Sequence, residues 1–93
     1  MRFEAVVEVM LRPGIADPQG ATVERALPVL GFSGIDGVRI GKAVRLFVDA
    51  ESPEAARQQV TLVTERLLAN PVIEDATVRL VDPAEEVSTP VAP

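Results

Sequence analysis

Few residues of this chain could take part in catalysis. Its 93 residues include no histidine and no cysteine, and Lys42 is the sole lysine. Glu4 and Glu8 are spaced to share one face of a strand and could in principle form a general acid and base. A carboxylate pair on an outer strand face is, however, typical of solvated surface. The serines are Ser33, Ser52 and Ser88. Without a histidine as base, a serine nucleophile could be activated only by a lysine. The sequence therefore predicts no active site.

Two glycine-containing segments, 31–34 and 37–42, could suggest a phosphate-binding loop. Neither has the spacing of a P-loop, and neither lies between a predicted strand and a helix N-terminus, where backbone amides converge on an anion. Turn glycines are the better interpretation. An RNA-binding module would need several aromatic residues on its central strands, where this sequence offers Phe47 alone.

Charge and composition narrow the class further. A formal net charge of −5 disfavours binding to nucleic acid and to anionic membranes. Hydrophobic residues make up 47% of the chain but aromatic residues only 3%. We therefore expect one domain with a thin core, which would gain stability by associating with copies of itself or with a partner. With no cysteine for disulfides and no apolar run long enough to span a bilayer, we expect a cytoplasmic protein.

The first elements that would position these residues follow from the hydrophobic pattern. Alternation from Phe3 to Leu11 predicts a strand. Asp17-Pro18 supplies an N-cap and a first-turn proline, so a helix begins there, and Gly31 can close it in a left-handed conformation. Pro28 removes one helical hydrogen bond, so we expect a kink there or an early end after Arg25. The predicted apolar face of this helix consists of Val23, Ala26, Leu27 and Leu30.

The second half of the chain repeats the pattern. Residues 34–49 are rich in β-branched residues around Gly41 and predict two strands or one long bent strand. Ser52-Pro53 begins a second helix and Asn70-Pro71 ends it. A last strand is predicted from Val72 to Val81. The predicted inner face of the second helix consists of Ala56, Val60, Val63 and Leu67.

The resulting order, β-α-β-β-α-β, predicts an α+β protein of the ferredoxin-like plan, with two helices on one face of a four-stranded antiparallel sheet. We assign residues 1–82 to this single domain. Residues 83–93 are rich in proline and acidic residues without periodicity, and we expect them to form a flexible tail.

The sheet face opposite the helices is expected to carry apolar residues from three strands. They are Val6, Met10, Phe47 and Val81. Contiguous exposed apolar surface marks a contact site on many proteins, so this face is our candidate interface. Scattered exposed apolar residues, which are common, are the alternative.

Three segments in order resemble one family, and the resemblance extends over residues 1 to about 82. They are Asp17-Pro18-Gln19-Gly20-Ala21-Thr22-Val23-Glu24-Arg25-Ala26-Leu27, Val38-Arg39-Ile40-Gly41-Lys42 and Leu67-Leu68-Ala69-Asn70-Pro71-Val72-Ile73-Glu74-Asp75. Together they look like the PurS family, the small subunit of phosphoribosylformylglycinamidine (FGAM) synthase.

This resemblance implies a subunit of the purine-pathway ligase that converts formylglycinamide ribonucleotide (FGAR) to FGAM with ATP and ammonia from glutamine. It implies a PurL-type synthetase and a PurQ-type glutaminase as partners, bridged by this subunit as a dimer or dimer of dimers. It also implies that the chain binds no cofactor or metal, because ATP and Mg²⁺ belong to the synthetase. The polar motif residues are then candidates for partner contact or shape, with a helix-end role as the alternative for Asn70; they are Arg39, Lys42, Asn70, Glu74 and Asp75.

Two other functions remain open from the residues. A ferredoxin-like regulatory domain would bind a small metabolite between paired sheets and would need converging polar groups in a pocket. A relative of acylphosphatases would need an anion-binding loop after the first strand, where Arg12-Pro13-Gly14 offers an arginine but no run of backbone donors.

Overall fold

The computed structural model describes residues 1–81 and 91 of the chain. The elements are β1 (Arg2–Leu11), α1 (Pro18–Val29), β2 (Gly41–Asp49), α2 (Pro53–Val63), a π-helical turn (Thr64–Leu68) and β3 (Glu74–Leu80). Within this part of the chain the three strands form one antiparallel sheet in the order β2-β1-β3. The α+β class predicted from the sequence is confirmed. The expected tail, residues 83–93, lies outside the described residues except for Val91.

The core lies between the central strand and α2. Ala5, Val7 and Val9 alternate along β1 and are buried under α2, which contributes Val60. Burying each such valine stabilises the fold by about 1.5–3 kcal/mol. The half-buried residues around this cluster come from both outer strands and from the end of the second helix; they are Val44, Leu46, Val48, Leu68, Ala69, Val78 and Leu80.

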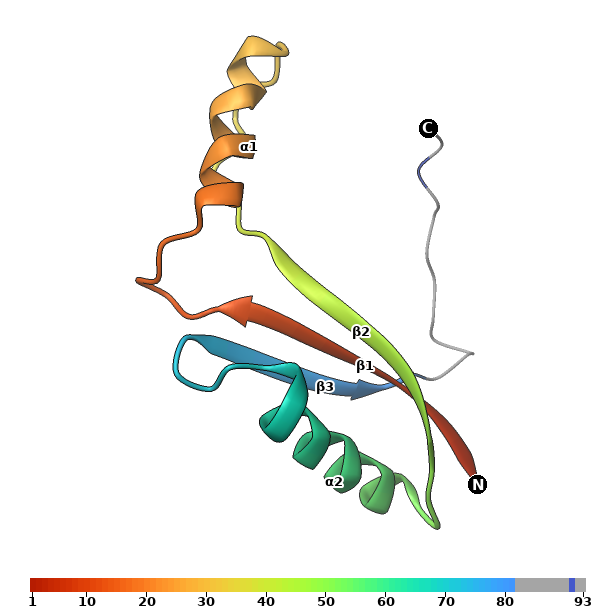
Figure 1. Cartoon of the computed structure of the whole chain (residues 1–93). Helices are drawn as coiled ribbons and strands as arrows, with labels where there is room; N and C mark the ends of the chain where they lie inside the picture. Colours follow the sequence, from red (N-terminus) through yellow and green to blue (C-terminus); the bar gives the residue numbers. More distant parts are fainter. Residues whose placement is uncertain (82–90, 92–93) are drawn as a thin grey trace.

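The first helix does not take its expected place. α2 covers one face of the sheet, whereas α1 projects beyond the end of β1 and has no extensive packing against the strands (Figure 1). The prediction of two helices on one sheet face is therefore wrong for this chain. The physical reason is the tie between α1 and the segment that follows it, which holds both away from the sheet.

The expected fourth strand is not present in the described residues either. Residues 34–40 return along α1 without strand pairing, and β2 begins only at Gly41. The backbone N–H of Val38 donates to Glu24 Oε1 at 2.8 Å, and that of Ile40 donates to Asp17 Oδ2 at 2.8 Å. The side chains of Glu24 and Asp17 therefore accept hydrogen bonds from backbone amides that would otherwise pair with a neighbouring strand.

The ends of α1 follow local rules. Asp17 caps the helix by accepting a hydrogen bond from Gly20 N at 2.9 Å. At the other end Phe32 N donates to Leu27 O, and Gly31 N, with φ +90, donates to Pro28 O, which is the pattern of a Schellman motif. The predicted closure at Gly31 is confirmed. An early end after Arg25 is wrong, because Pro28 lies in the last turn and the helix continues to Val29.

The second helix ends in a π-helical turn that changes which side chains face the core. Ala69 N donates to Thr64 O at 3.0 Å, a bond between residues five apart. Ala56 and Val60 are buried as predicted. Leu67, predicted to be inside, is 79% exposed, and Val63 is 39% exposed. Thr64 is buried instead, four residues after Val60 on the same helical stripe, and the π-helical turn that follows brings Leu68 rather than Leu67 against the core.

Candidate docking surfaces

Among residues 1–81, the largest group of exposed apolar side chains lies on the projecting element, here called the arm (α1 and residues 30–40). The sequence identified part of its apolar face but assigned it to the core. Because α1 leaves the sheet, this face is uncovered in the single chain (Figure 1). The large exposed apolar residues of the arm are Val23, Val29, Leu30, Phe32 and Ile35, with exposures from 42% to 86%.

The arm is held together by close approach of its two segments. A Cβ atom added to Gly20 would lie 2.4 Å from the carbonyl oxygen of Val38, so only glycine allows the returning backbone to lie this close to α1. The carboxylates of Glu24 and Asp17 then accept hydrogen bonds from the backbone N–H groups of Val38 and Ile40, respectively. The arm is therefore an ordered element, although it has little apolar core of its own.

The carboxyl group of Asp17 has a lowered pKa. Hydrogen bonds from the N–H groups of Gly20 and then Ile40 lower the pKa of Asp17, because both stabilise the carboxylate, and the nearby Arg39 charge acts in the same direction. Burial opposes this shift only in part. Asp17 is therefore ionised at neutral pH and is committed to its two amide partners.

The face of the sheet opposite α2 carries all four predicted apolar residues, as the register places them. Phe47 is 57% exposed, and Met10 and Val81 are half-buried. Val6 is only 6% exposed, because its register neighbours are Arg45 on β2 and Arg79 on β3, whose long stems flank it. The expected contiguous apolar strip is thus interrupted by charged residues. Its role as an interface stays a prediction.

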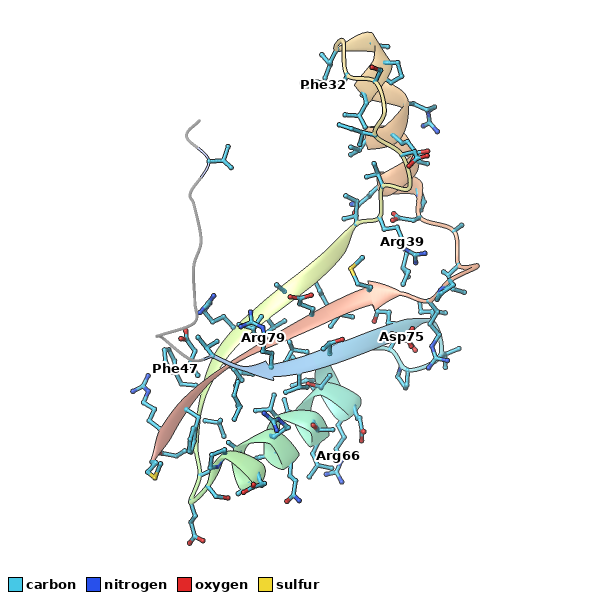
Figure 2. All side chains as sticks on the ribbon, turned by 180° about the vertical axis from the view of Figure 1, so that it is seen from behind. Phe32, Arg39, Phe47, Arg66, Asp75 and Arg79 are labelled. Atoms are coloured by element: carbon cyan, nitrogen blue, oxygen red, sulfur yellow. The ribbon has the colours of Figure 1, made fainter. Side chains whose placement is uncertain are left out.

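Charged side chains make contacts with one another and with Phe47 on this same face. The Arg2 guanidinium carbon lies 4.2 Å from the centroid of the Phe47 ring, a cation–π contact. Arg45 Nη1 lies 2.8 Å from Glu4 Oε2. Figure 2 shows Phe47 and Arg79 in this region of the sheet. The face therefore carries one exposed aromatic ring among charged side chains.

The polar motif residues mostly bind backbone groups within the chain. The Arg39 guanidinium donates to the carbonyl oxygens of Leu11 and Arg12. No hairpin forms at Gly41, where β2 begins, and Arg39 is nevertheless exposed. Lys42 lies on β2 opposite Val9 and is exposed.

Asn70, Glu74 and Asp75 shape the connection from α2 to β3. Asn70 Oδ1 accepts from Val72 N at 3.0 Å, and Glu74 Oε1 accepts from Asn70 N at 2.7 Å. These bonds give Asn70 the helix-end role that was its alternative. Asp75 Oδ1 lies 3.4 Å from Arg12 Nε.

A hollow of about 300 Å³ lies where the arm meets the sheet. Asp17, Lys42 and Glu74 contribute polar groups to its lining, and Val9, Leu11 and Ile40 contribute apolar ones. Asp17 and Glu74 already accept backbone amides. The hollow therefore combines apolar lining with Lys42 and with two carboxylates that already bind backbone N–H groups.

Among the described residues, no group of three or more acidic, histidine or cysteine residues could hold a metal ion. None of the described helices is long and apolar enough to cross a membrane.

Comparison with known proteins places this geometry in context. The profile of the PurS family, described as phosphoribosylformylglycinamidine (FGAM) synthase, matches residues 4–82. The FGAM synthase subunit PurS of Mycobacterium leprae is 46% identical over 74 residues, which cover 80% of this chain and 90% of that protein.

Solved structures agree with the sequence comparison. The crystal structure of the FGAM synthase PurS subunit from Thermotoga maritima has a TM-score of 0.82 at 36% identity and covers 87% of this chain and 93% of that chain. A chain in the structure of PurLQS from Thermotoga maritima matches with the same TM-score and identity, over 87% of this chain and 99% of that chain.

Proposed function

The chain belongs to the PurS family, and from this premise we propose that it is the PurS subunit of an FGAM synthase, a glutamine-hydrolysing ligase of purine biosynthesis. In this role it bridges a PurL-type synthetase and a PurQ-type glutaminase, so that ammonia released from glutamine is used to convert FGAR to FGAM. The similarity to a chain of PurLQS supports these two partners.

The observation that carries the bridging role is the arm. An ordered element that leaves five large apolar side chains exposed gains stability when another surface covers them. Burial of apolar area contributes roughly 25 cal/mol per Å², and aromatic side chains such as Phe32 are common interface anchors. A subunit whose task is docking needs such surfaces, and the sequence offers no histidine or cysteine for chemistry.

Self-association is part of the proposal. The exposed arm and the adjacent hollow provide apolar surface for a second copy, as a dimer or a dimer of dimers. A helix layer of the expected ferredoxin-like kind would then be completed between copies rather than within one chain. The face carrying Met10, Phe47 and Val81 is a second contact surface for the partner subunits.

The remaining roles follow the family. We place ATP and Mg²⁺ on the synthetase subunit and none on this chain, and we place the complex in the cytoplasm, where nucleotide precursors are made. The polar motif residues then act through the shape they give to the arm and the α2–β3 connection.

Co-assembly tests the proposal. The purified chain, the PurL-type synthetase and the PurQ-type glutaminase are mixed with ATP and glutamine and examined by sedimentation velocity. A single species that contains all three subunits, and that does not form when the chain is omitted, supports the bridging role. Full assembly of synthetase and glutaminase without the chain would overturn it.

A further inference from the structure

Four segments of the chain meet where the arm joins the sheet. They are the end of β1, the start of α1, the end of the returning segment and the start of β3. We call the residues that join the arm to β1 the arm junction (Leu11, Arg12, Asp17, Arg39 and Ile40). Figure 2 shows Arg39 between the arm and the strands, with Asp75 at the same end of the sheet.

Two charged side chains tie the arm to itself and to β1. The Arg39 guanidinium reaches across from the returning segment and donates to the carbonyl oxygens of Leu11 and Arg12, the latter at 3.3 Å. Asp17 uses both carboxylate oxygens, one for Gly20 N at 2.9 Å and one for Ile40 N at 2.8 Å. The two covalent connections of the arm are thus cross-linked at its base.

Arg12 extends this network to the sheet edge. Its Nη2 donates to Pro71 O at 2.6 Å, and its Nε lies 3.4 Å from both Glu74 O and Asp75 Oδ1. Arg39 therefore binds the backbone of Arg12, and the side chain of Arg12 is in turn bound to the α2–β3 connection. The base of the arm is fixed through three segments of the sheet domain.

These contacts matter because α1 has no extensive packing against the sheet. Between β1 and α1 the chain turns through Pro13 and Gly14, and Gly14 has φ +88, a region that glycine enters easily. Without the side-chain ties, this turn and the passage from Ile40 into β2 would be the covalent links that set the direction of the arm. Charge-assisted hydrogen bonds are the stronger kind, and losing one shifts an equilibrium by about tenfold.

We propose that Arg39 and Asp17 are positioning residues that hold the arm at one orientation to the sheet, and that this orientation is required to couple the glutaminase to the synthetase. The coupling half rests on the proposed function. An arm free to swing would present its apolar face and the sheet face at variable spacing, so that the two docking surfaces could not engage together at full affinity.

A distance measurement tests the orientation. The chain has no cysteine, so nitroxide labels can be placed on Val29→Cys in the arm and Thr77→Cys on β3, both exposed positions. Labelled chains are diluted with unlabelled chains, and the distance distribution is recorded by pulsed EPR. We expect one narrow distribution for the otherwise unchanged chain and a clearly broadened or shifted one for Arg39→Ala and for Asp17→Asn.

Arg25→Ala is the matched control. Arg25 is also an exposed arginine of the arm, but it donates a hydrogen bond to Thr22 Oγ1 within α1, at 3.3 Å. Its distribution should match the unchanged chain. If Arg39→Ala and Asp17→Asn also match it, the orienting role is overturned. If Arg39→Ala does not fold by circular dichroism, Asp17→Asn and Arg39→Lys decide the matter.

Turnover tests the coupling. In the reconstituted synthase, Arg39→Ala should lower glutamine-dependent turnover by about tenfold and leave ammonia-dependent turnover unchanged. Arg25→Ala should leave both turnover rates unchanged. If Arg39→Ala broadens the distance distribution but keeps the glutamine-dependent turnover of the unchanged chain, the coupling half of the proposal is overturned. If the unchanged chain itself supports no glutamine-dependent turnover, the proposed function fails, whereas the distance measurement still decides the orientation.

Discussion

Gly20 and Val38 lie in such close contact that a Cβ atom on Gly20 would stand 2.4 Å from the Val38 carbonyl oxygen. This contact brings α1 and the returning segment together and lets Glu24 reach the Val38 amide. The geometry of the arm therefore depends on one residue without a side chain in the first turn of α1.

Gly20→Ala should loosen the arm. Alanine favours a helix over glycine by about 1 kcal/mol, yet its Cβ would collide with backbone at Val38 and with the Asp17 carboxylate. We expect the collision to dominate, since backbone cannot move aside as a side chain can. Hydrogen exchange at Val38 and Ile40 should accelerate about tenfold or more. Unchanged exchange at these amides would show that the contact is not needed.

Phe32 and Leu30 should carry much of the binding of the arm. Both are more than half exposed, so replacing both with serine should leave the fold of the single chain intact, as circular dichroism would show. Because each buried apolar side chain contributes about 1.5 kcal/mol or more, self-association or binding to partner subunits should weaken by tenfold or more. Sedimentation equilibrium measures this.

Leu67→Ser is the control for the arm variant. Leu67 is 79% exposed but lies on the π-helical turn, away from the arm. Association should stay at the level of the unchanged chain in this variant. Equal weakening by both changes would mean that the arm has no special part in docking.

Val7→Ala should destabilise the fold strongly. Val7 is fully buried at the centre of β1, and removing two methyl groups leaves a cavity, at a cost of about 2–3 kcal/mol. Val72→Ala, at a site that is 78% exposed, should change the free energy of unfolding by less than about 0.5 kcal/mol. Urea denaturation measures both. Similar values for the two variants would contradict the assigned core.

The stability of the chain should contain a pH-dependent part that comes from Asp17. Its pKa is lowered in the folded state by the amides of Gly20 and Ile40, so its contribution is present above the unfolded pKa and disappears as pH falls through the folded pKa. The stability difference between the unchanged chain and Asp17→Asn should therefore shrink as pH falls from about 7 to about 2. A difference independent of pH would exclude this role for Asp17.

The features that the sequence predicted correctly depend on neighbouring residues. The caps at Asp17 and Ser52 and the left-handed Gly31 are set within one turn of chain, and local rules describe them well. The alternation of β1 and the identity of Val60 as a core residue are local in the same sense.

The features that the sequence missed depend on distant contacts. Residues 34–40 have a strand-like composition, but Asp17 and Glu24, far earlier in the chain, bind the amides of Ile40 and Val38 and keep the segment out of the sheet. The position of Leu67 was missed because a π-helical turn breaks the helical period. The candidate site changed accordingly, since apolar residues predicted for the core lie on the exposed arm.

Glutamine-dependent turnover tests the central claim most directly. The PurL-type synthetase and PurQ-type glutaminase are assayed for FGAM formation with glutamine or with ammonia, each with and without this chain. We predict that glutamine-dependent turnover requires the chain, that ammonia-dependent turnover does not, and that the chain alone is inactive. Equal glutamine-dependent turnover with and without the chain would contradict its role as the bridging subunit.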